Sequence, residues 1–362
     1  HMANVPRVLT KFEAAIKANT IENKSLALTR NLFGRVFDTK LELQLKVDGD
    51  PGTHFIYDNT FLKKIRTNFG LENAQFMISG SAPIAISTLK FLKASLNIGF
   101  GQGYGLTETF AGICVSEFYE VNPGTCGAPG VTAEIKIREL PELGYHLNDQ
   151  GGPRGELLIR GFNNFSHYYK NDEETSKAVK DGWFYTGDVA HIDEGGRISI
   201  IDRVKNFFKL SQGEYITPEK IENLYLSLNP FLSQLFIHGD LTQSYVVGIA
   251  GVDPIIGRQF LLSQGVLKDE IDSDKKFLEV LNEKKHRQTL IDELYGQVTK
   301  GFKLQGFEKL KNVYFEIEPL TLQRDVVTPT LKLKRPVAAK FFKEQIASMY
   351  NEGPLDSGSS KL

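Results

Sequence analysis

The chain has little of the features that would place it in several large protein classes. Its two cysteines, Cys114 and Cys126, lack metal-ligand spacing, which in an intracellular protein predicts reduced thiols in a packed region. No apolar run is long enough to cross a bilayer, so we expect no transmembrane segment, and peripheral membrane contact stays open. Neither sign of charge dominates, since 43 Lys and Arg balance 44 Asp and Glu, and this balance gives no argument for a nucleic-acid partner.

The two ends of the sequence have features that do not belong to a folded domain. No signal peptide stands at the start, and His1-Met2 looks like a cloning remnant. At the other end, Ser360-Lys361-Leu362 is the tripeptide that peroxisomal import receptors recognise, and it follows a small, polar run at 351–359. A chance tripeptide is the alternative. We therefore predict peroxisomal localisation and binding of this tail to an import receptor.

The length of 362 residues is sufficient for two or more domains. The first part alternates between helical and strand patterns, which predicts βαβ units and a parallel sheet covered by helices. The helices are expected within 3–40, 59–69 and 84–95, and the strands at 75–78 and 96–100.

The pattern changes after residue 123. Short strands with turn signals predict a small β subdomain, with strands at 133–138, 155–160, 189–192 and 197–201 and a hairpin through 194–196. A second boundary falls near 202–205. Beyond it the pattern is typical of a compact α+β domain, with a hairpin-like segment at 207–216, a helix from Pro218, strands at 235–238, 245–252 and 313–317, and helical stretches at 268–297 and 337–350.

The most informative stretch is 101–109, with the sequence Gly-Gln-Gly-Tyr-Gly-Leu-Thr-Glu-Thr. It follows an apolar strand and precedes 110–115, which we expect to form the first turns of a helix. Glycines let the backbone approach a ligand, and a helix N-terminus offers free N–H groups to a phosphate. Thr107 can donate its hydroxyl to a phosphate oxygen, Glu108 can hold Mg²⁺, and Tyr104 offers a flat face for a base. The alternative is an ordinary tight turn between two elements.

This stretch belongs to a series of five motifs in a fixed order. They are Ser79-Gly80-Ser81-Ala82-Pro83, Gly103-Tyr104-Gly105-Leu106-Thr107-Glu108, Gly155-Glu156-Leu157-Leu158-Ile159-Arg160-Gly161, Trp183-Phe184-Tyr185-Thr186-Gly187-Asp188, and Asp202-Arg203-Val204-Lys205-Asn206 leading to Gln212-Gly213-Glu214-Tyr215-Ile216. Together they closely resemble the acyl-adenylate-forming superfamily. The segment 209–222 is similar to its long-chain fatty acyl-CoA synthetase branch, and the terminal Ser-Lys-Leu adds a resemblance to fungal peroxisomal members. The resemblance extends from about residue 5 to residue 350.

The resemblance implies an α/β fold in two parts. Residues 3–203 would form the C-terminal portion of a large AMP-binding domain, with the β subdomain at about 124–203. Residues 204–350 would form a smaller, mobile α+β domain, followed by the tail at 351–362. The family uses ATP and Mg²⁺ to convert a fatty acid to acyl-AMP and then transfers the acyl group to CoA, so we expect the same substrates and metal here.

The resemblance also assigns roles to the residues of the glycine-rich motif. Tyr104 would stack on adenine, and Gly103 and Gly105 would form the nucleotide-binding backbone around it. Thr107 would contact the α-phosphate, and Glu108 would hold Mg²⁺. All five residues would thus lie at the site where ATP and the fatty acid react.

Further nucleotide contacts are implied by the neighbouring motifs. Asp188 would accept both ribose hydroxyls, and Arg203 would reach the ribose or a phosphate. Ser81, Ala82 and Pro83 would form part of the wall around the nucleotide and the acyl chain. The structural alternatives are a turn-forming role for Asp188 and a surface ion pair for Arg203.

Residues of the last third would serve the alternation between the two half-reactions. Lys205 matches the hinge position, and Gly213 would line the CoA channel, although a simple hairpin turn is compatible with the same glycine. A lysine near the end contacts the α-phosphate during adenylation, and here Lys332 is preferred over Lys334. The alternative for both lysines is a solvated basic patch, because the Gly-Lys form common in the superfamily is absent.

One family feature is missing from the sequence. The Ser/Thr/Gly-rich loop whose lysine holds the β- and γ-phosphates does not occur. We therefore expect the chain to be a shortened form of a longer enzyme and to catalyse little by itself. Competing interpretations are another adenylating enzyme, such as an aryl- or dicarboxylate-CoA ligase or a luciferase-like enzyme, and a non-catalytic binding module that keeps the fold. A kinase or dehydrogenase is excluded because neither Gly-x-Gly-x-x-Gly nor a Walker lysine follows a strand.

Overall fold

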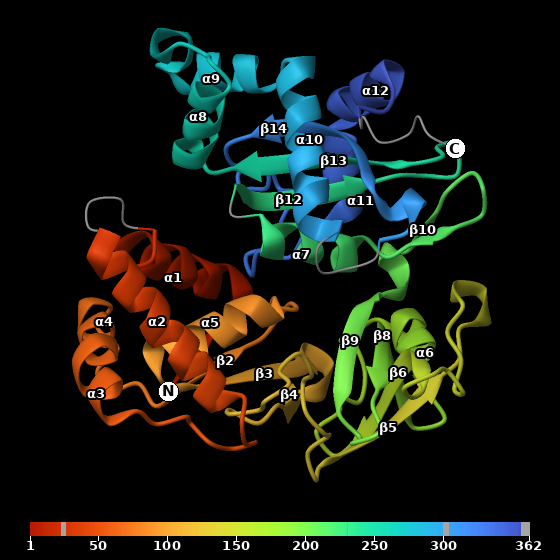
Figure 1. Cartoon of the computed structure of the whole chain (residues 1–362). Helices are drawn as coiled ribbons and strands as arrows, with labels where there is room; N and C mark the ends of the chain where they lie inside the picture. Colours follow the sequence, from red (N-terminus) through yellow and green to blue (C-terminus); the bar gives the residue numbers. More distant parts are fainter. Residues whose placement is uncertain (23–26, 230, 300–303, 356–362) are drawn as a thin grey trace. The chain divides into compact units, whose positions relative to one another are not determined.

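The computed structural model describes residues 1–22, 27–229, 231–299 and 304–355, so the predicted tail signal lies outside the described residues. The chain folds as two compact units, His1–Val204 and Lys205–Leu362 (Figure 1). Each unit has its own sheets and hydrophobic core. No helix in the described ranges is long and apolar enough to cross a membrane.

A four-stranded sheet forms the first half of the N-terminal unit. Its order is β1 (Met2–Asn4), β2 (Phe76–Ser79), β3 (Gly99–Leu106) and β4 (Ala111–Val115). The first three strands run parallel, as the βαβ pattern predicts, although residues 3 and 4 lie in β1 and not in the helical region expected at 3–40. Helices α1 (Pro6–Asn19), α2 (Ala27–Gln44) and α5 (Ile86–Leu96) pack apolar side chains against this sheet, and the short segments α3 (Phe55–Tyr57), η1 (Asp58–Leu62) and α4 (Lys63–Asn68) complete this core (Figure 1).

The predicted helix at 110–115 is wrong, because this segment is the strand β4. A single 3-10 turn, η2 (Thr107–Thr109), follows β3. Phe110 and Ala111 then adopt left-handed backbone with φ of +52° and +80°, which turns the chain back on itself. The returning segment pairs antiparallel with β3 and buries Ile113 and Cys114. The strand expected at 96–100 is also shifted, since α5 includes Leu96 and β3 begins at Gly99.

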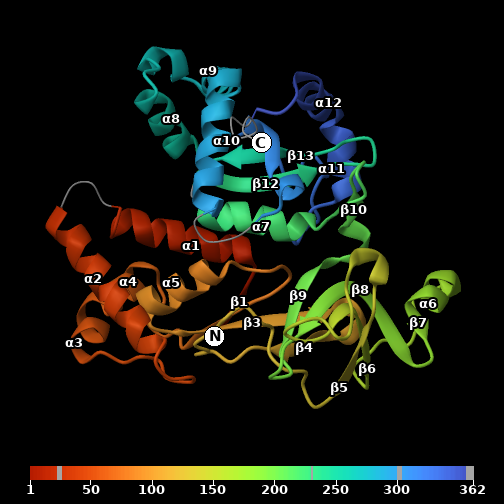
Figure 2. The same ribbon diagram turned by 45° about the vertical axis from the view of Figure 1, so that its right-hand side comes forward.

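A five-stranded antiparallel sheet forms the rest of this unit (Figure 2). Its order is β5 (Ala133–Arg138), β6 (Arg154–Gly161), β8 (Trp183–Ile192) and β7 (Val179–Lys180), with β9 (Ile198–Arg203) paired to β8; the short helix α6 (Asp172–Ala178) precedes β7. The predicted strands and the hairpin through 194–196 are confirmed. One detail differs: Asp188 does not precede a strand, because β8 starts at Trp183 and contains it. A register shift opposite Leu157 and the φ of +70° at Gly187 mark a bulge at this point.

The C-terminal unit is a three-stranded sheet between two layers of helices (Figures 1 and 2). The order is β12 (Leu232–His238), β13 (Val246–Val252) and β14 (Leu310–Glu316), preceded by the small hairpin of β10 (Phe208–Lys209) and β11 (Tyr215–Ile216). One face packs on α7 (Pro218–Leu228), α8 (Pro254–Ser263), α9 (Asp274–Leu281) and α10 (Lys284–Thr299), and the other on α11 (Arg335–Phe341) and α12 (Lys343–Glu352). The sequence patterns predicted the strands, the hairpin and α7, but not α8. The helical stretch expected at 268–297 is divided into η5 (Lys268–Ile271), α9 and α10, and the helix expected at 337–350 is divided into α11 and α12.

Candidate functional site

Three residues predicted from separate motifs meet in the N-terminal unit. The Tyr104 hydroxyl donates to Asp188 Oδ2 at 2.6 Å, and Arg203 Nε pairs with Asp188 Oδ1 at 2.9 Å. These side chains come from β3, β8 and β9, and Asp188 lies opposite Arg203 in the pairing of β8 with β9. The sheet pairing therefore brings together residues that lie up to 99 positions apart in the sequence.

Burial sets the electrostatics of this cluster. Only 5% of the Asp188 side chain is exposed, whereas half of the Arg203 side chain reaches solvent. Desolvation, followed by the neighbouring Asp188 carboxylate, raises the pKa of Tyr104 well above its ordinary value. Tyr104 therefore stays protonated and donates to the carboxylate at neutral pH. The ion pair expected as the structural alternative for Arg203 is present, with Asp188 as the partner.

The Thr107–Thr109 turn beside this cluster is held by the loop that follows β6. Phe165 N donates to Glu108 O at 2.7 Å, and Asn163 Nδ2 donates to Thr109 O at 3.0 Å. The hydroxyl of Tyr168 donates to Glu108 Oε1 at 2.8 Å, and burial together with this carboxylate raises the pKa of Tyr168 to about 12. Sequence reasoning missed Tyr168, because a tyrosine in a polar loop has no spacing that distinguishes it.

Glu108 and Asp188 are the two carboxylates of this site, and Asp188 is already paired with Tyr104 and Arg203. Glu108 is therefore the candidate Mg²⁺ ligand. Within the described ranges, no three or more His, Cys, Asp or Glu side chains come together as a metal-binding group. Mg²⁺ is usually held by one or two carboxylates together with substrate phosphates and water. The Glu108 carboxylate, oriented by Tyr168, fits this requirement.

The two glycines that flank Tyr104 differ in the space that a side chain would have. A Cβ at Gly105 would lie 1.8 Å from Ala111 O, so the close approach of β4 requires glycine there. A Cβ at Gly103 would make ordinary contacts of 3.5 Å with Ile78 and Val115. Gly105 is thus explained by strand packing in the hairpin, and it does not need a ligand to explain it.

The motif that contains Ser81, Ala82 and Pro83 lies at the carboxyl end of β2, between that strand and α5. Ser81 and Ala82 are exposed, and Ser81 adopts a φ of +75°. A Cβ at Gly80 would lie 3.9 Å from Gly103 O, which places this loop beside the middle of β3, just past its last residue paired with β2. In open α/β sheets, ligands bind outside the carboxyl ends of the strands.

The remaining predicted residues belong to the C-terminal unit. Lys205 is exposed in the 3-10 turn η4 (Val204–Asn206), where the two units join. Gly213, with a φ of +101°, turns the chain between β10 and β11 while its N–H donates to Leu210 O at 2.9 Å. A hairpin turn therefore accounts for this glycine.

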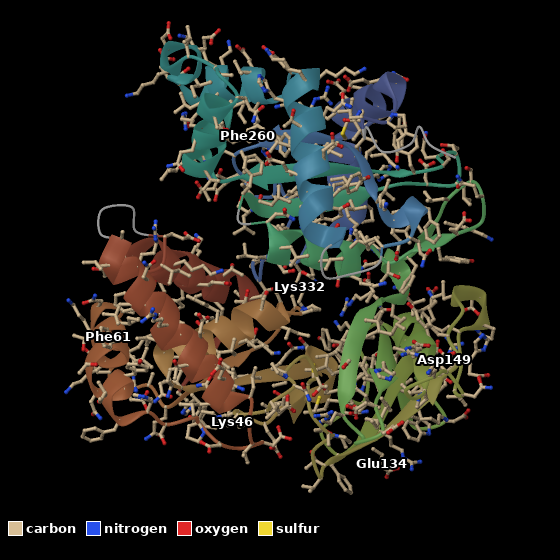
Figure 3. The ribbon with its side chains drawn as sticks, in the orientation of Figure 1. Lys46, Phe61, Glu134, Asp149, Phe260 and Lys332 are labelled. Carbon is tan, nitrogen blue, oxygen red and sulfur yellow. The ribbon has the colours of Figure 1, made fainter. Side chains whose placement is uncertain are left out.

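The two candidate lysines have different surroundings. Lys334 Nζ pairs with Asp325 Oδ1 at 2.5 Å. Lys332, labelled in Figure 3, is exposed, and its ammonium has no hydrogen bond or ion pair with any residue in the described part of the chain. Lys332 is thus the lysine of the two whose charge is available to a ligand.

Comparisons with known proteins agree with the motif order. A family model of AMP-binding enzymes matches residues 1–169. The chain is 38% identical over 366 residues to a peroxisomal acyl-CoA ligase of Penicillium roqueforti, covering 99% of this chain and 51% of the relative. It is 36% identical over 350 residues to a peroxisomal long chain acyl-CoA synthetase of Arabidopsis thaliana, covering 96% of this chain and 48% of the relative. The chain spans about half the length of these relatives.

Comparison with solved structures gives a result that agrees with the sequence comparisons. The adenylation domain of a carboxylate reductase from Mycobacterium chelonae superposes with a TM-score of 0.71 at 25% identity, covering 96% of this chain and 46% of that chain. The predicted α/β adenylate-forming fold is therefore confirmed. An o-succinylbenzoate CoA synthetase of Bacillus subtilis, which superposes with a TM-score of 0.51 at 18% identity, has been solved with ATP and a magnesium ion. The chain is therefore similar to AMP-binding enzymes and, among these, to acyl-CoA ligases and long chain acyl-CoA synthetases.

Proposed function

We propose that this chain is the nucleotide-binding and C-terminal part of a fatty acid–CoA ligase. In the first half-reaction a fatty carboxylate oxygen attacks the α-phosphorus of ATP, which gives acyl-AMP and releases pyrophosphate. In the second, the thiol of CoA loses its proton and attacks the acyl carbon, which gives acyl-CoA and releases AMP. The observation that supports this most directly is the Tyr104–Asp188–Arg203 cluster beside the Thr107–Thr109 turn.

The N-terminal unit supplies the groups for nucleotide binding. Asp188 accepts the ribose hydroxyls, and its buried position keeps the carboxylate oriented by Arg203. Tyr104 lies against adenine, and Thr107 donates to the α-phosphate. Glu108 and the phosphates would hold Mg²⁺, and the ion would supply positive charge against the repulsion of the attacking carboxylate. The loop of Ser81, Ala82 and Pro83 borders the nucleotide and the acyl chain.

The C-terminal unit supplies different groups to the two half-reactions. Lys332 neutralises the α-phosphate during adenylation, and its charge is available because no described residue pairs with it. Lys205 lies where the two units join, so a change of its φ and ψ would let the C-terminal unit rotate as a domain. After the rotation, the β10–β11 turn around Gly213 lines the path of CoA.

A medium- or long-chain fatty acid is the proposed substrate, because the relatives are named acyl-CoA ligases and long chain acyl-CoA synthetases. Another adenylating ligase with an aryl or dicarboxylate substrate is the second candidate, since an anthranilate CoA ligase and an o-succinylbenzoate CoA synthetase share the fold. ATP–pyrophosphate exchange by the full-length protein with acids of increasing chain length distinguishes the two. Exchange that requires an aryl acid and ignores fatty acids would contradict the first proposal.

A non-catalytic module is the alternative from a different class. Calorimetry of the printed chain with a non-hydrolysable acyl-AMP analogue tests it directly. We expect specific binding that the Asp188→Ala variant loses. Identical heats for the wild type and this variant would favour a module that only keeps the fold.

We also propose a peroxisomal location for the protein. Two relatives are named peroxisomal, and the printed sequence ends with Ser360-Lys361-Leu362. A fluorescent protein with these residues at its C-terminus should enter peroxisomes. The same protein without the final leucine should stay outside, and equal import of both would contradict the proposal.

A further inference from the structure

A buried ion pair lies beside the loop that contains Lys332. Arg335, the first residue of α11, donates from Nη1 to Glu222 Oε1 at 2.9 Å and from Nη2 to Glu222 Oε2 at 2.6 Å. Only 11% of the Arg335 side chain and 8% of the Glu222 side chain are exposed. Two parallel hydrogen bonds between planar groups restrict orientation as well as distance, so this bidentate ion pair fixes the two side chains relative to each other.

Glu222 is held by more than this one partner. It lies in the middle of α7, and its Oε1 also accepts from Ile237 N of β12 at 2.8 Å. The pair therefore joins the start of α11 to both α7 and the central sheet. Both of these elements contribute to the large hydrophobic core of the C-terminal unit, in which Ile221, Tyr225 and Leu235 are buried.

The segment that precedes Arg335 is a closed hairpin. Val327 and Leu333 form an isolated antiparallel bridge, and Lys334 N donates to Val326 O at 2.8 Å. At the tip, Thr328 N donates to Lys332 O at 2.8 Å, while Lys332 N donates to Thr328 Oγ1 at 3.0 Å. The backbone of Lys332 is thus fixed within the hairpin, and the hairpin ends at the residue that pairs with Glu222.

We infer that Glu222 and Arg335 are positioning residues for Lys332, an inference that rests on the proposed adenylation role of this lysine. The lysine side chain is long and flexible, and within the described ranges it has no partner, so the backbone that bears it must set where the ammonium can reach. A shift of about 1 Å at a reacting centre costs about 10²-fold in rate. The pair does not contact the substrate, and it acts by holding the base of the hairpin on α7 and β12.

The test separates the two half-reactions in the full-length protein. Arg335→Lys keeps the positive charge but loses the bidentate contact. Glu222→Gln keeps the side-chain shape but loses the negative charge. Both variants should lower fatty-acid-dependent ATP–pyrophosphate exchange about 10- to 100-fold and leave thioester formation from supplied acyl-AMP within about twofold. Lys220→Gln is the matched control, because Lys220 lies on the same helix as Glu222 but forms a half-exposed ion pair with Glu308. Its loss should change neither reaction.

Hydrogen exchange of the printed chain gives a readout that does not depend on activity. In Arg335→Lys the amides of 326–334 should exchange faster, while those of α7 and β12 keep their protection. Equal loss in both half-reactions, or unchanged exchange of 326–334, would overturn the inference. If Lys332→Ala itself leaves adenylation intact, the proposed role of Lys332 is wrong. If Lys332→Ala impairs adenylation and the two pair variants do not, the positioning inference alone is wrong.

Discussion

The two units hold their candidate site groups in opposite ways. In the N-terminal unit, Asp188 is buried within a strand and already contacts Tyr104 and Arg203. In the C-terminal unit, Lys332 is exposed on a hairpin, and its charge meets no partner in the part of the chain that the structure describes. A carboxylate inside a sheet must be paired because desolvation would otherwise be costly, whereas an exposed ammonium keeps its hydration.

This difference indicates how each group would be made ready for a nucleotide. The orientation of Asp188 comes from its neighbours, so no reorganisation is needed when a ligand binds. The orientation of Lys332 comes only from the hairpin backbone and from the Glu222–Arg335 pair at its base. Substitutions in the first unit should therefore affect binding, and substitutions in the second should affect one reaction step.

The largest effect is expected from Asp188→Ala. A hydrogen bond to a charged group contributes about 1.5–3 kcal/mol, so loss of two ribose contacts should weaken binding of an acyl-AMP analogue about 10²- to 10⁴-fold. Calorimetry measures the dissociation constant, and thermal unfolding reports whether the variant folds. Asp193→Ala is the control, because it removes a carboxylate that pairs with Arg197 in the same hairpin. Wild-type affinity of a folded Asp188→Ala variant would show that Asp188 does not contact the ligand.

Lys332→Ala should have the next largest effect. Loss of one charged contact to the α-phosphate should slow adenylation about 10- to 100-fold in the full-length protein and leave thioester formation from acyl-AMP unchanged. Lys334→Ala is the comparison, since Lys334 already pairs with Asp325 and should affect adenylation little. If Lys334→Ala has the larger effect on adenylation, the adenylation lysine is Lys334 and not Lys332.

Gly105→Ala tests the rigidity of the β3–β4 hairpin. The new methyl group would collide with Ala111 O, so we expect the free energy of unfolding to fall by about 1–3 kcal/mol or more. Gly103→Ala, whose methyl group meets only ordinary contacts, should change stability by much less. Urea unfolding of the two variants measures the difference. Equal stabilities would show that β4 does not approach β3 as closely as described.

The smallest effect concerns the titration of Tyr168. Its pKa of about 12 lies above the ordinary value of 10, so the folded state retains the proton longer than the unfolded state. Its contribution to stability is therefore complete below about pH 10 and is lost as the pH rises towards 12. Tyr168→Phe should flatten this alkaline decline, as followed by unfolding at several pH values. An unchanged slope would indicate that Tyr168 does not donate to Glu108.

Several parts of the fold could be predicted because their signals are local. Pro218 at the first turn of α7 and the Gly195-Gly196 turn between β8 and β9 have the same meaning in any context. The segment 110–115 was predicted wrongly for the opposite reason. Its Phe-Ala-Gly start suits several backbone states, and only the pairing with β3 selects a strand.

The site divides in the same way. The sequence by itself determined the kinds of groups present: the motif order predicts Tyr104, Glu108 and Asp188 as site residues, and Lys332 is the preferred candidate from a separate segment near the end. Only the tertiary structure decided their partners: Arg203 and Tyr104 on Asp188, Tyr168 on Glu108, and Glu222 on Arg335. The physical reason is that a residue's chemistry is a local property, whereas its partner depends on strand register and helix packing between residues far apart in the chain.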